Sequence, residues 1–319
     1  MKARDQRSAQ VTPSNLITLL TISVLILGLL VLLASCQPAP TADARRPRTT
    51  TTTTTSTTTT TTPSTTVPIA GTDSTAALQA DLNDGSLFVD RQYIVNGMLK
   101  PPANSTITFG TNGSFVRNII PTANTTPFIM MEQSGVTIRN ARITGTNPCW
   151  WTNTLPYNPA SIGQTYSQWA AASEEQAAFY VKNKAGNIVI ENAVVRDVWG
   201  DGVTLLDAGS NITITNLDAR CLGRSGISNV SSDRVTVTGG KVSGAFWWAL
   251  NIEPFSTRAV SNYRVSGMEI GFTRNYWLFV GGPYFNCNVT NVDATGNILL
   301  PTSSRPPQIA ACVATQVKY

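Results

Sequence analysis

The sequence predicts an all-β protein in which short strands stack as successive turns of a coil. The first observation is a six-residue motif, a β-branched strand closed by Asn or Gly, that recurs through the C-terminal two thirds of the 319 residues. Its copies end at Asn140, Asn192, Asn216, Gly239, Gly267 and Asn291. The second observation is the spacing of these end residues, which is 24, 23, 28 and 24 from Asn192 onward. Such a period is typical of stacked repeat proteins, with one structural unit per repeat.

The composition of the motif explains why each copy is a strand followed by a turn. Copies such as residues 187–192 and 211–216 alternate β-branched and polar residues, as strands with one buried face do. Asn and Gly tolerate the left-handed backbone of a tight turn better than other residues. We call these strands the motif column. The 52 residues between Asn140 and Asn192 are interpreted as two repeats plus an insertion.

Two further strands are expected in every turn. Apolar triplets recur at residues 179–181, 203–205, 227–229, 250–252 and 278–280, and we call them the triplet column. By the period-2 rule their outer residues point inward and their middle residues outward, and only Asn229 breaks the apolar inner set. A third column follows each motif. Its middle positions are often charged, as a solvated face should be, at Arg142, Asp218, Lys241, Glu269 and Asp293.

Three strands in a turn of about 24 residues, with Asn at a repeated corner, resemble the right-handed parallel β-helix of the pectate-lyase-like superfamily. The resemblance covers about residues 72–319. It implies a single-stranded β-helix domain over residues 71–319. Lyases, hydrolases, epimerases and inert adhesins share this fold, so the resemblance is specific for fold rather than function. The start also fits, because residues 73–85 read as a capped amphipathic helix with a Gly stop that would plug the first turn.

The N-terminal 70 residues are expected to be separate from the coil. Lys2, Arg4 and Arg7 precede an uncharged apolar run over residues 16–35, long enough to cross a bilayer. The run ends in Leu-Ala-Ser-Cys36, which resembles the lipobox of bacterial lipoproteins. Residues 1–36 are therefore expected to be a signal peptide with its lipobox, and cleavage before Cys36 would make Cys36 the lipidated first residue. An uncleaved anchor helix is the alternative. Residues 37–70 are nearly all Thr, Pro, Ser and Ala and read as a disordered tether.

These features predict a protein held at the extracellular face of a bacterial cell membrane by its N-terminus. The formal charge of +5 reflects the N-terminal segments, because six of 23 basic and two of 18 acidic residues lie in residues 1–70. The remaining 17 basic and 16 acidic residues provide no electrostatic reason to expect nucleic acid as a partner. The absence of His excludes Ser-His-Asp and Cys-His catalysis. Carboxylate chemistry, Arg or Lys as a base, or a Ca²⁺ ion remain.

Four cysteines follow Cys36, and an even number in an exported protein favours two disulfides. We expect Cys287 to pair with Cys312 and fold the tail onto the last turn. Cys149 would then pair with Cys221 and fix the insertion to the coil. Buried free thiols are the alternative. No CxxC spacing supports a zinc site.

Stacking places outward residues of the triplet column in rows about 4.8 Å apart. The first row holds Tyr180, Thr204, Ser228, Asn251 and Phe279, and the second holds Lys182, Leu206, Val230, Glu253 and Gly281. Asp201 and Arg224 precede the triplets, and Asp207 follows one of them. Asp207 and Glu253, two turns or roughly 10 Å apart, would suit an inverting glycosidase, whose carboxyls stand about 6.5–9.5 Å apart.

Two fragments strengthen the case for this region. Arg224-Ser-Gly-Ile-Ser228 and Ile252-Glu253-Pro254 resemble a paired Arg-x-Gly-Ile-Ser and Gly-Ile-Asp-Ile-Glu-Pro signature of bacterial β-helix proteins. Asn251 stands where that signature has Asp, which weakens an acid–base pair with Glu253. Arg224 and Glu253 are alternatively partnered surface charges, and Asp201 is alternatively a turn former. The acids are scattered rather than clustered, so the sequence does not support a calcium site and no cofactor is expected.

Aromatic residues provide the strongest functional indication. All seven Trp lie in the insertion or in the turn that enters the triplet column, the latter being Trp199, Trp247, Trp248 and Trp277. Aromatic faces beside polar side chains commonly bind sugar rings. The Trp side chains alternatively pack the insertion against the coil, or form a protein interface.

Two function classes follow from these observations. The first is a polysaccharide lyase or glycoside hydrolase, with Glu253 and Asp207 as acid and base and Arg224 and Lys182 holding substrate or abstracting a proton. In that site Asp201, Tyr180, Ser228, Asn251 and the four Trp would bind the glycan. The second is a non-catalytic adhesin or glycan-binding protein with the same groove. Convergence of Asp207, Glu253 and Arg224 on an open cleft would favour the enzyme, and buried or ion-paired partners would favour the binding protein.

Overall fold

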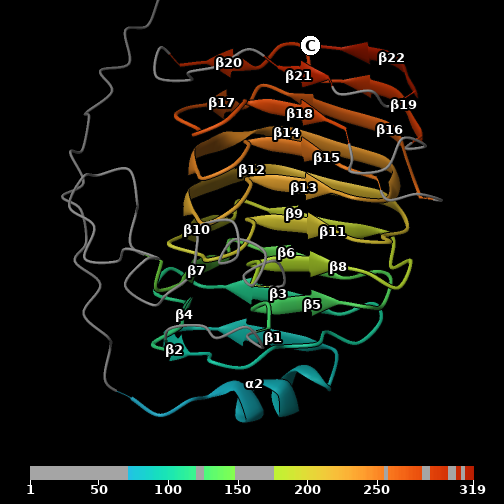
Figure 1. The fold of residues 1–319 in the computed structure, drawn as a ribbon. Helices are drawn as coiled ribbons and strands as arrows, with labels where there is room; N and C mark the ends of the chain where they lie inside the picture. Colours follow the sequence, from blue (N-terminus) through green and yellow to red (C-terminus); the bar gives the residue numbers. More distant parts are fainter. Residues whose placement is uncertain are drawn as a thin grey trace, which may run out of the picture. The chain divides into compact units, whose positions relative to one another are not determined.

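The computed structural model describes residues 71–119, 126–147, 176–254, 258–281, 288–300, 307–309 and 313–319. The described residues are mostly β with one short helix. They form a parallel β-solenoid of about seven turns with about 25 residues per turn, as the sequence predicts (Figure 1). The segments 1–36 and 37–70 lie outside the described residues, as do most of the expected insertion and the residues around Cys287 and Cys312. No helix in the described part has the length and apolarity needed to span a membrane.

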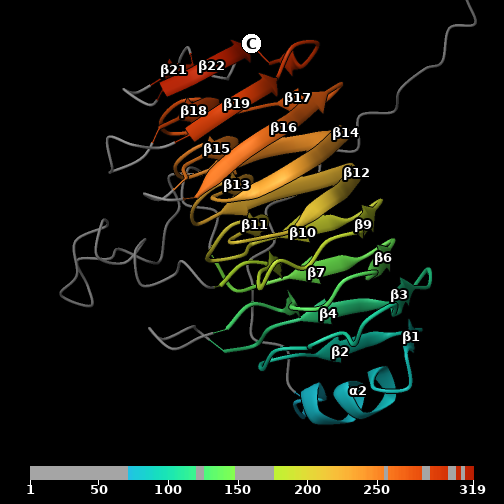
Figure 2. The ribbon, with the colours of Figure 1, turned by 90° about the vertical axis from the view of Figure 1, so that its right-hand side faces the viewer.

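Three strand columns build each turn, and every strand pairing in them is parallel. The motif column contains β1 (Ser86–Val89), β3 (Thr106–Phe109), β6 (Thr137–Arg139), β9 (Ile188–Glu191), β12 (Ser210–Leu222), β14 (Ser232–Ala245), β16 (Ala259–Ser266), β19 (Asn288–Asp293) and β22 (Val313–Lys318). The third column contains β2 (Gln92–Ile94), β4 (Ser114–Val116), β7 (Arg142–Thr144), β10 (Val194–Arg196), β17 (Glu269–Ile270) and β20 (Ile298–Leu299). Strands β12 and β14 run through both columns, which therefore form one sheet (Figure 2).

The triplet column forms a separate seven-stranded sheet. Its strands are β5 (Ile129–Met131), β8 (Phe179–Val181), β11 (Val203–Leu205), β13 (Ile227–Asn229), β15 (Leu250–Ile252), β18 (Leu278–Val280) and β21 (Gln308–Ile309). The register pairs Val203 with Phe179 and Ile227, as the 24-residue offsets predict. The inward residues belong to one continuous core, and burial of each large aliphatic side chain contributes about 1.5–3 kcal/mol. Asn229 is the expected exception in this inner set, and its Oδ1 accepts a hydrogen bond from Ser232 Oγ at 2.8 Å.

The asparagine corners explain the repeated motif. Asn140, Asn192 and Asn216 all have positive φ, which costs Asn less than other side-chain-bearing residues. Asn192 Nδ2 donates to Asn140 Oδ1 at 3.2 Å, and Asn216 Nδ2 donates to Asn192 Oδ1 at 3.0 Å. One side chain therefore satisfies the next over these three turns, where Asn supplies both the positive-φ backbone and the amide. Gly239 and Gly267 supply only the positive-φ backbone at the later turns.

The prediction that two repeats separate Asn140 from Asn192 is wrong. Strand β6 pairs directly with β9, with Thr137 opposite Val189, so the 52 residues belong to a single turn. Extra residues at a corner leave the strand pairing intact, because lengthening a loop adds little closure entropy. The spacing of end residues alone does not distinguish an enlarged turn from two ordinary ones.

The register predicted for the last motif copy is also wrong. Asn291 donates to Asn262 at 2.6 Å, so it stacks on the start of the preceding copy rather than on Gly267. The Gly267 N–H instead donates to the Gly296 carbonyl. Asp293 consequently lies in β19 opposite Arg264, and not in the third column as expected. Both ends of the motif select residues that accept positive φ, so an Asn fits the pattern in either register.

The expected N-terminal helix is present as α2 (Thr75–Leu82). Asp73 Oδ1 accepts hydrogen bonds from the Thr75 backbone N–H at 3.0 Å and from Thr75 Oγ1 at 2.6 Å. Leu78 and Leu82 are buried in the core shared with the strands. The helix thus covers the first turn, as shown at the foot of Figure 1.

Candidate functional site

The outer side of the triplet column is where the sequence places the site. Register confirms the first outward row, since Thr204 lies opposite Tyr180 and Ser228, and Asn251 lies opposite Ser228 and Phe279. Except for Phe279, however, these side chains are buried, with Asn251 only 1% exposed. Tyr180 packs with Met130 and Ala177 in a cluster separate from the core. The row predicted to face outward is therefore covered in this structure, apart from Phe279.

Asp201 and Arg224 form a buried ion pair at the entry corner, which we define as the turns 199–202, 223–226 and 246–249 that enter β11, β13 and β15. Arg224 Nε lies 3.7 Å from Asp201 Oδ1, and the two side chains are 6% and 1% exposed. Asp201 Oδ1 also accepts the Ser225 N–H at 2.8 Å, and its Oδ2 accepts Thr204 Oγ1 at 2.9 Å. The carboxylate thus joins two turns and offsets the charge of Arg224.

A second polar group joins β13 and β15. Asn251 Nδ2 donates to Ser228 Oγ at 3.1 Å and to Glu253 Oε2 at 3.1 Å. Glu253 is partly exposed, whereas Asn251 and Ser228 are buried. The Asn that replaces the Asp of the resembling signature therefore acts as a donor to Glu253. An Asp at the same place would bring a second negative charge against that carboxylate.

The four entry-corner and neighbouring Trp residues divide into two kinds. Trp199 and Trp277 are buried, and Trp199 Nε1 donates to Thr146 Oγ1 at 2.9 Å. Trp247 and Trp248 are partly exposed, with ring centroids 5.2 Å apart.

The exposed pair extends into a larger group. Trp248 stacks on Phe279 at 4.6 Å with an interplanar angle of 17°, and the Arg224 guanidinium lies 4.6 Å from the Trp247 ring. We call Trp247, Trp248 and Phe279 the aromatic cluster. The three rings of this cluster are partly accessible to solvent.

Lys182 and Asp207, the other two predicted catalytic residues, follow the triplet strands, at the same end as Glu253. Lys182 follows β8, and its Nζ lies 3.4 Å from Glu132 Oε1, an acid that also pairs with Lys100 at 2.9 Å. Asp207 follows β11 with φ of +54° and lines a cavity that includes neither Glu253 nor Arg224. The structure therefore brings Asp201 together with Arg224, and Asn251 with Glu253. It places Lys182 in an ion pair with Glu132 and Asp207 at a separate cavity.

Asp197 is a titrating group that sequence reasoning missed. It directly follows β10, before the entry corner, and has φ of +54°. Burial raises its pKa from 3.8 to about 6, and nearby Arg196 opposes that rise only in part. No motif marks this carboxyl, and its positive φ alone would indicate a turn.

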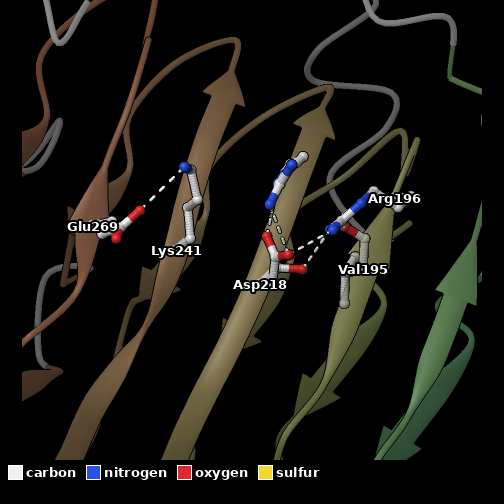
Figure 3. Close-up of polar contacts among 6 residues, drawn as sticks. Val195, Arg196, Asp218, Lys241 and Glu269 are labelled. Carbon is white, nitrogen blue, oxygen red and sulfur yellow. Dashed lines mark hydrogen bonds and ion pairs between the residues drawn. The ribbon is translucent and has the colours of Figure 1, made fainter. Parts of the chain in front are cut away.

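The charged residues of the third column form ion pairs along the solenoid (Figure 3). Asp218 Oδ2 lies 2.6 Å from Arg196, Asp218 Oδ1 lies 2.8 Å from Arg220, and Lys241 lies 3.1 Å from Glu269. The Arg196–Asp218 and Lys241–Glu269 pairs link neighbouring turns, whereas Asp218 and Arg220 pair within β12. They contribute order to the sheet rather than a reactive centre.

The next two features are the candidate metal-binding groups and the cysteines of the described residues. In the described ranges, no group of three or more Cys, Asp or Glu is arranged to hold a metal ion. Cys221 is disulfide-bonded, but its partner lies outside the described residues, as do Cys36, Cys149, Cys287 and Cys312. The predicted pairings and the lipidation of Cys36 therefore stay predictions.

Comparison with known proteins returned no matching family model, no matching curated protein and no matching solved structure. The likeness to the pectate-lyase-like superfamily therefore rests on the residues given above, and the parallel β-solenoid is the level of classification that the findings support.

Proposed function

We propose that this protein is a glycan-binding protein held at the extracellular face of a bacterial cell membrane by its N-terminal segment. The β-solenoid presents the aromatic cluster of Trp247, Trp248 and Phe279 to a polysaccharide or cell-surface glycan.

The observation that carries the proposal is the partial exposure of this cluster beside polar groups. Trp248 and Phe279 are stacked with nearly parallel rings, and Trp247 is braced by Arg224. Sugar rings bind such surfaces because their C–H faces pack on aromatic carbon, while polar neighbours bond the hydroxyls. Asn251 lies opposite Phe279 in the register and donates to the partly exposed Glu253, so polar groups lie on the same sheet as the cluster.

The pairing of the charged residues favours binding over catalysis. An acid–base pair must reach its substrate, and catalytic groups must lie within hydrogen-bond distance of the reacting atoms. Asp201 and Arg224 are buried against each other instead. Lys182 pairs with Glu132, and Asp207 lies at the opposite end of the triplet strands. A lyase or hydrolase that uses these residues in concert would require them to rearrange.

The anchor is part of the same proposal. The apolar run over residues 16–35 and Cys36 would place the protein at the membrane, and the Thr-rich segment 37–70 would hold the solenoid away from it. Metabolic labelling with a radiolabelled fatty acid tests lipidation, since the label should enter the protein and should be lost in Cys36→Ser. Label that persists in Cys36→Ser would exclude Cys36 as the lipidated residue.

The binding proposal is tested with the purified full chain and a panel of neutral and acidic polysaccharides. We expect retention of at least one glycan without any product, and a loss of affinity of about ten-fold or more in Trp248→Ala. Phe88→Ala, which removes an aromatic side chain that is 65% exposed on β1, is the matched control and should bind normally.

Product analysis separates the alternatives. New reducing ends alone would identify a hydrolase, and unsaturated products that absorb in the ultraviolet would identify a lyase. Either result would overturn the proposal of a non-catalytic protein. Equal loss of binding in Phe88→Ala and Trp248→Ala would remove the aromatic cluster from it.

A further inference from the structure

A cavity of about 620 Å³, open to solvent, lies away from the entry corner, where the chain leaves the triplet column. It is lined by Lys184, Asp207, Ala208, Gly209, Ser210, Ser231, Ser232, Asp233, Arg258, Ala259 and Ser261. These residues come from successive turns, following β8, β11 and β13 and beginning β16. We call these turns the exit corner. Stacked turns stand about 4.8 Å apart, so the cavity extends along the solenoid axis.

Backbone hydrogen bonds link the turns that line this cavity. The Lys184 N–H donates to the Asp207 carbonyl at 2.7 Å, and the Ala208 N–H donates to the Ser231 carbonyl at 2.9 Å. Lys184 and Asp207 both have positive φ, which turns the chain sharply at successive levels. The two side chains therefore start from neighbouring points on a backbone that the strands hold in register.

Asp233 forms an ordered wall of the cavity. Its Oδ1 accepts hydrogen bonds from Ser261 Oγ at 2.7 Å and from Asn262 Nδ2 at 2.8 Å, and Arg234 lies 2.9 Å from its Oδ2. The hydrogen bond from Ser261 is the main cause that lowers the pKa of Asp233. This carboxylate is thus ionised and its charge is already compensated.

Three other charges at the cavity are not compensated in this way. Across the described part of the chain, the side chains of Asp207, Lys184 and Arg258 have no hydrogen bond or ion pair. Lys184 and Arg258 lie on the turns on either side of those that carry Asp207 and Ser231. The cavity therefore combines two available cations, one available carboxylate and several hydroxyl groups.

We propose that this cavity binds a small sugar or polyol that carries one oxyanion, such as a phosphate, sulfate or carboxylate group. Lys184 and Arg258 hold the oxyanion, because charge-assisted hydrogen bonds from ammonium and guanidinium groups to anionic oxygen are the strong ones. Asp207 accepts a hydroxyl hydrogen from the same ligand, and it repels a bare anion that offers no donor. The volume is in the range of sites for small ligands. This inference is independent of the glycan proposed for the aromatic cluster.

In the experiment, isothermal titration calorimetry measures binding of five compounds to the full chain. They are glucose 6-phosphate, glucose 6-sulfate, glucuronate, glucose and inorganic phosphate. We expect at least one anionic sugar to bind ten-fold or more tightly than glucose, with an affinity that falls as salt rises. The three anionic arms identify which oxyanion the site takes. Inorganic phosphate should bind more weakly than glucose 6-phosphate.

Variants separate the roles of the lining residues. Lys184→Gln and Arg258→Gln should each lower affinity for the preferred sugar about ten-fold or more. Asp207→Asn should lower affinity for that sugar while leaving inorganic phosphate bound equally or more tightly. Arg264→Gln, a charge removal on β16 outside the cavity lining, is the matched control and should have no effect.

Three results would overturn the inference. Glucose binding as tightly as every anionic sugar would exclude an oxyanion site, and an equal effect of Arg264→Gln and Arg258→Gln would indicate non-specific charge attraction. Loss of the small anionic sugars in Trp248→Ala would place them at the aromatic cluster instead. Because Trp248→Ala and Arg258→Gln act on different sites, failure of one proposal is distinguishable from failure of the other.

Discussion

The entry and exit corners flank the same three-residue strands, but they differ in whether their charged side chains form ion pairs. At the entry corner Asp201 and Arg224 are buried against each other, under the aromatic cluster. At the exit corner Asp207, Lys184 and Arg258 line a cavity without such pairing. A buried ion pair holds turns together, whereas unpaired charges in a cavity remain available to a ligand. The comparison indicates that the charged residues of the entry corner are structural, whereas those of the exit corner remain available for recognition.

The largest effect is expected from breaking the entry-corner pair. Asp201→Asn removes the charge that compensates buried Arg224, so we expect the free energy of unfolding to fall by about 3–5 kcal/mol. Urea denaturation followed by circular dichroism measures this. Asp218→Asn, in the partly exposed ion pairs of the third column, is the control and should cost about 1 kcal/mol or less. Equal losses in the two variants would contradict a special role for the entry corner.

The pairing of Asp201 with Arg224 is a feature that the sequence did not predict, although it predicted the strands on either side. The period of 24 residues and the alternation of apolar residues predicted the solenoid, the three columns and the rows of the triplet column. Those features follow from backbone geometry, which repeats. Arg224 was weighed as a partner of Glu253 and Asp201 as a turn former, because a row shows which turns are adjacent but not where long side chains end.

Two other outcomes have the same physical cause. The burial of Tyr180, Ser228 and Asn251 could not be predicted from the alternation pattern, which shows that a side chain points outward but not that it is covered. The exit cavity combines residues whose sequence spacing carries no motif. Its four charged lining residues, Lys184, Asp207, Asp233 and Arg258, come from different turns, and only Asp207 was singled out in advance.

The asparagine corner shows how much stability a corner gains from uncharged groups alone. Asn192 lies between Asn140 and Asn216 in one ladder. Asn192→Ala removes both amide contacts and places Ala at positive φ, so we expect a loss of about 2–4 kcal/mol. Asn192→Gly keeps the backbone conformation accessible and should lose about 1–2 kcal/mol less. Urea denaturation of both variants checks this, and equal losses would show that the turn conformation is not strained for Ala.

Asp197, which precedes the entry corner, should make the free energy of unfolding depend on pH. The folded pKa of Asp197 is about 6, raised from 3.8 chiefly by burial. Because the folded state holds this proton more tightly, the stabilisation from Asp197 is complete below about pH 4 and is lost as pH rises through about 6. Asp197→Asn should therefore be more stable than the parent protein at pH 7.5, by about 1–3 kcal/mol.

The test compares the free energies of unfolding of the two proteins at pH 4.5 and pH 7.5. The difference should be small at pH 4.5, where Asp197 is protonated in the folded state, and larger at pH 7.5. A difference that does not change with pH would mean that Asp197 titrates normally. Asp218→Asn, whose carboxylate is paired with Arg196 and Arg220, should not show this gain at pH 7.5.

The smallest effect on stability is expected at the exit corner. Asp207→Asn keeps a residue that tolerates φ of +54° and removes a carboxylate without a paired cation, so the free energy of unfolding should change by no more than about 0.5 kcal/mol. The same variant should lose much of the rise in melting temperature that the preferred anionic sugar gives the parent protein, because ligand stabilisation follows affinity. A large loss of stability without ligand would assign Asp207 to the framework. The contrast between Asp201→Asn and Asp207→Asn, two chemically identical changes six residues apart, therefore decides whether the two corners differ as the structure indicates.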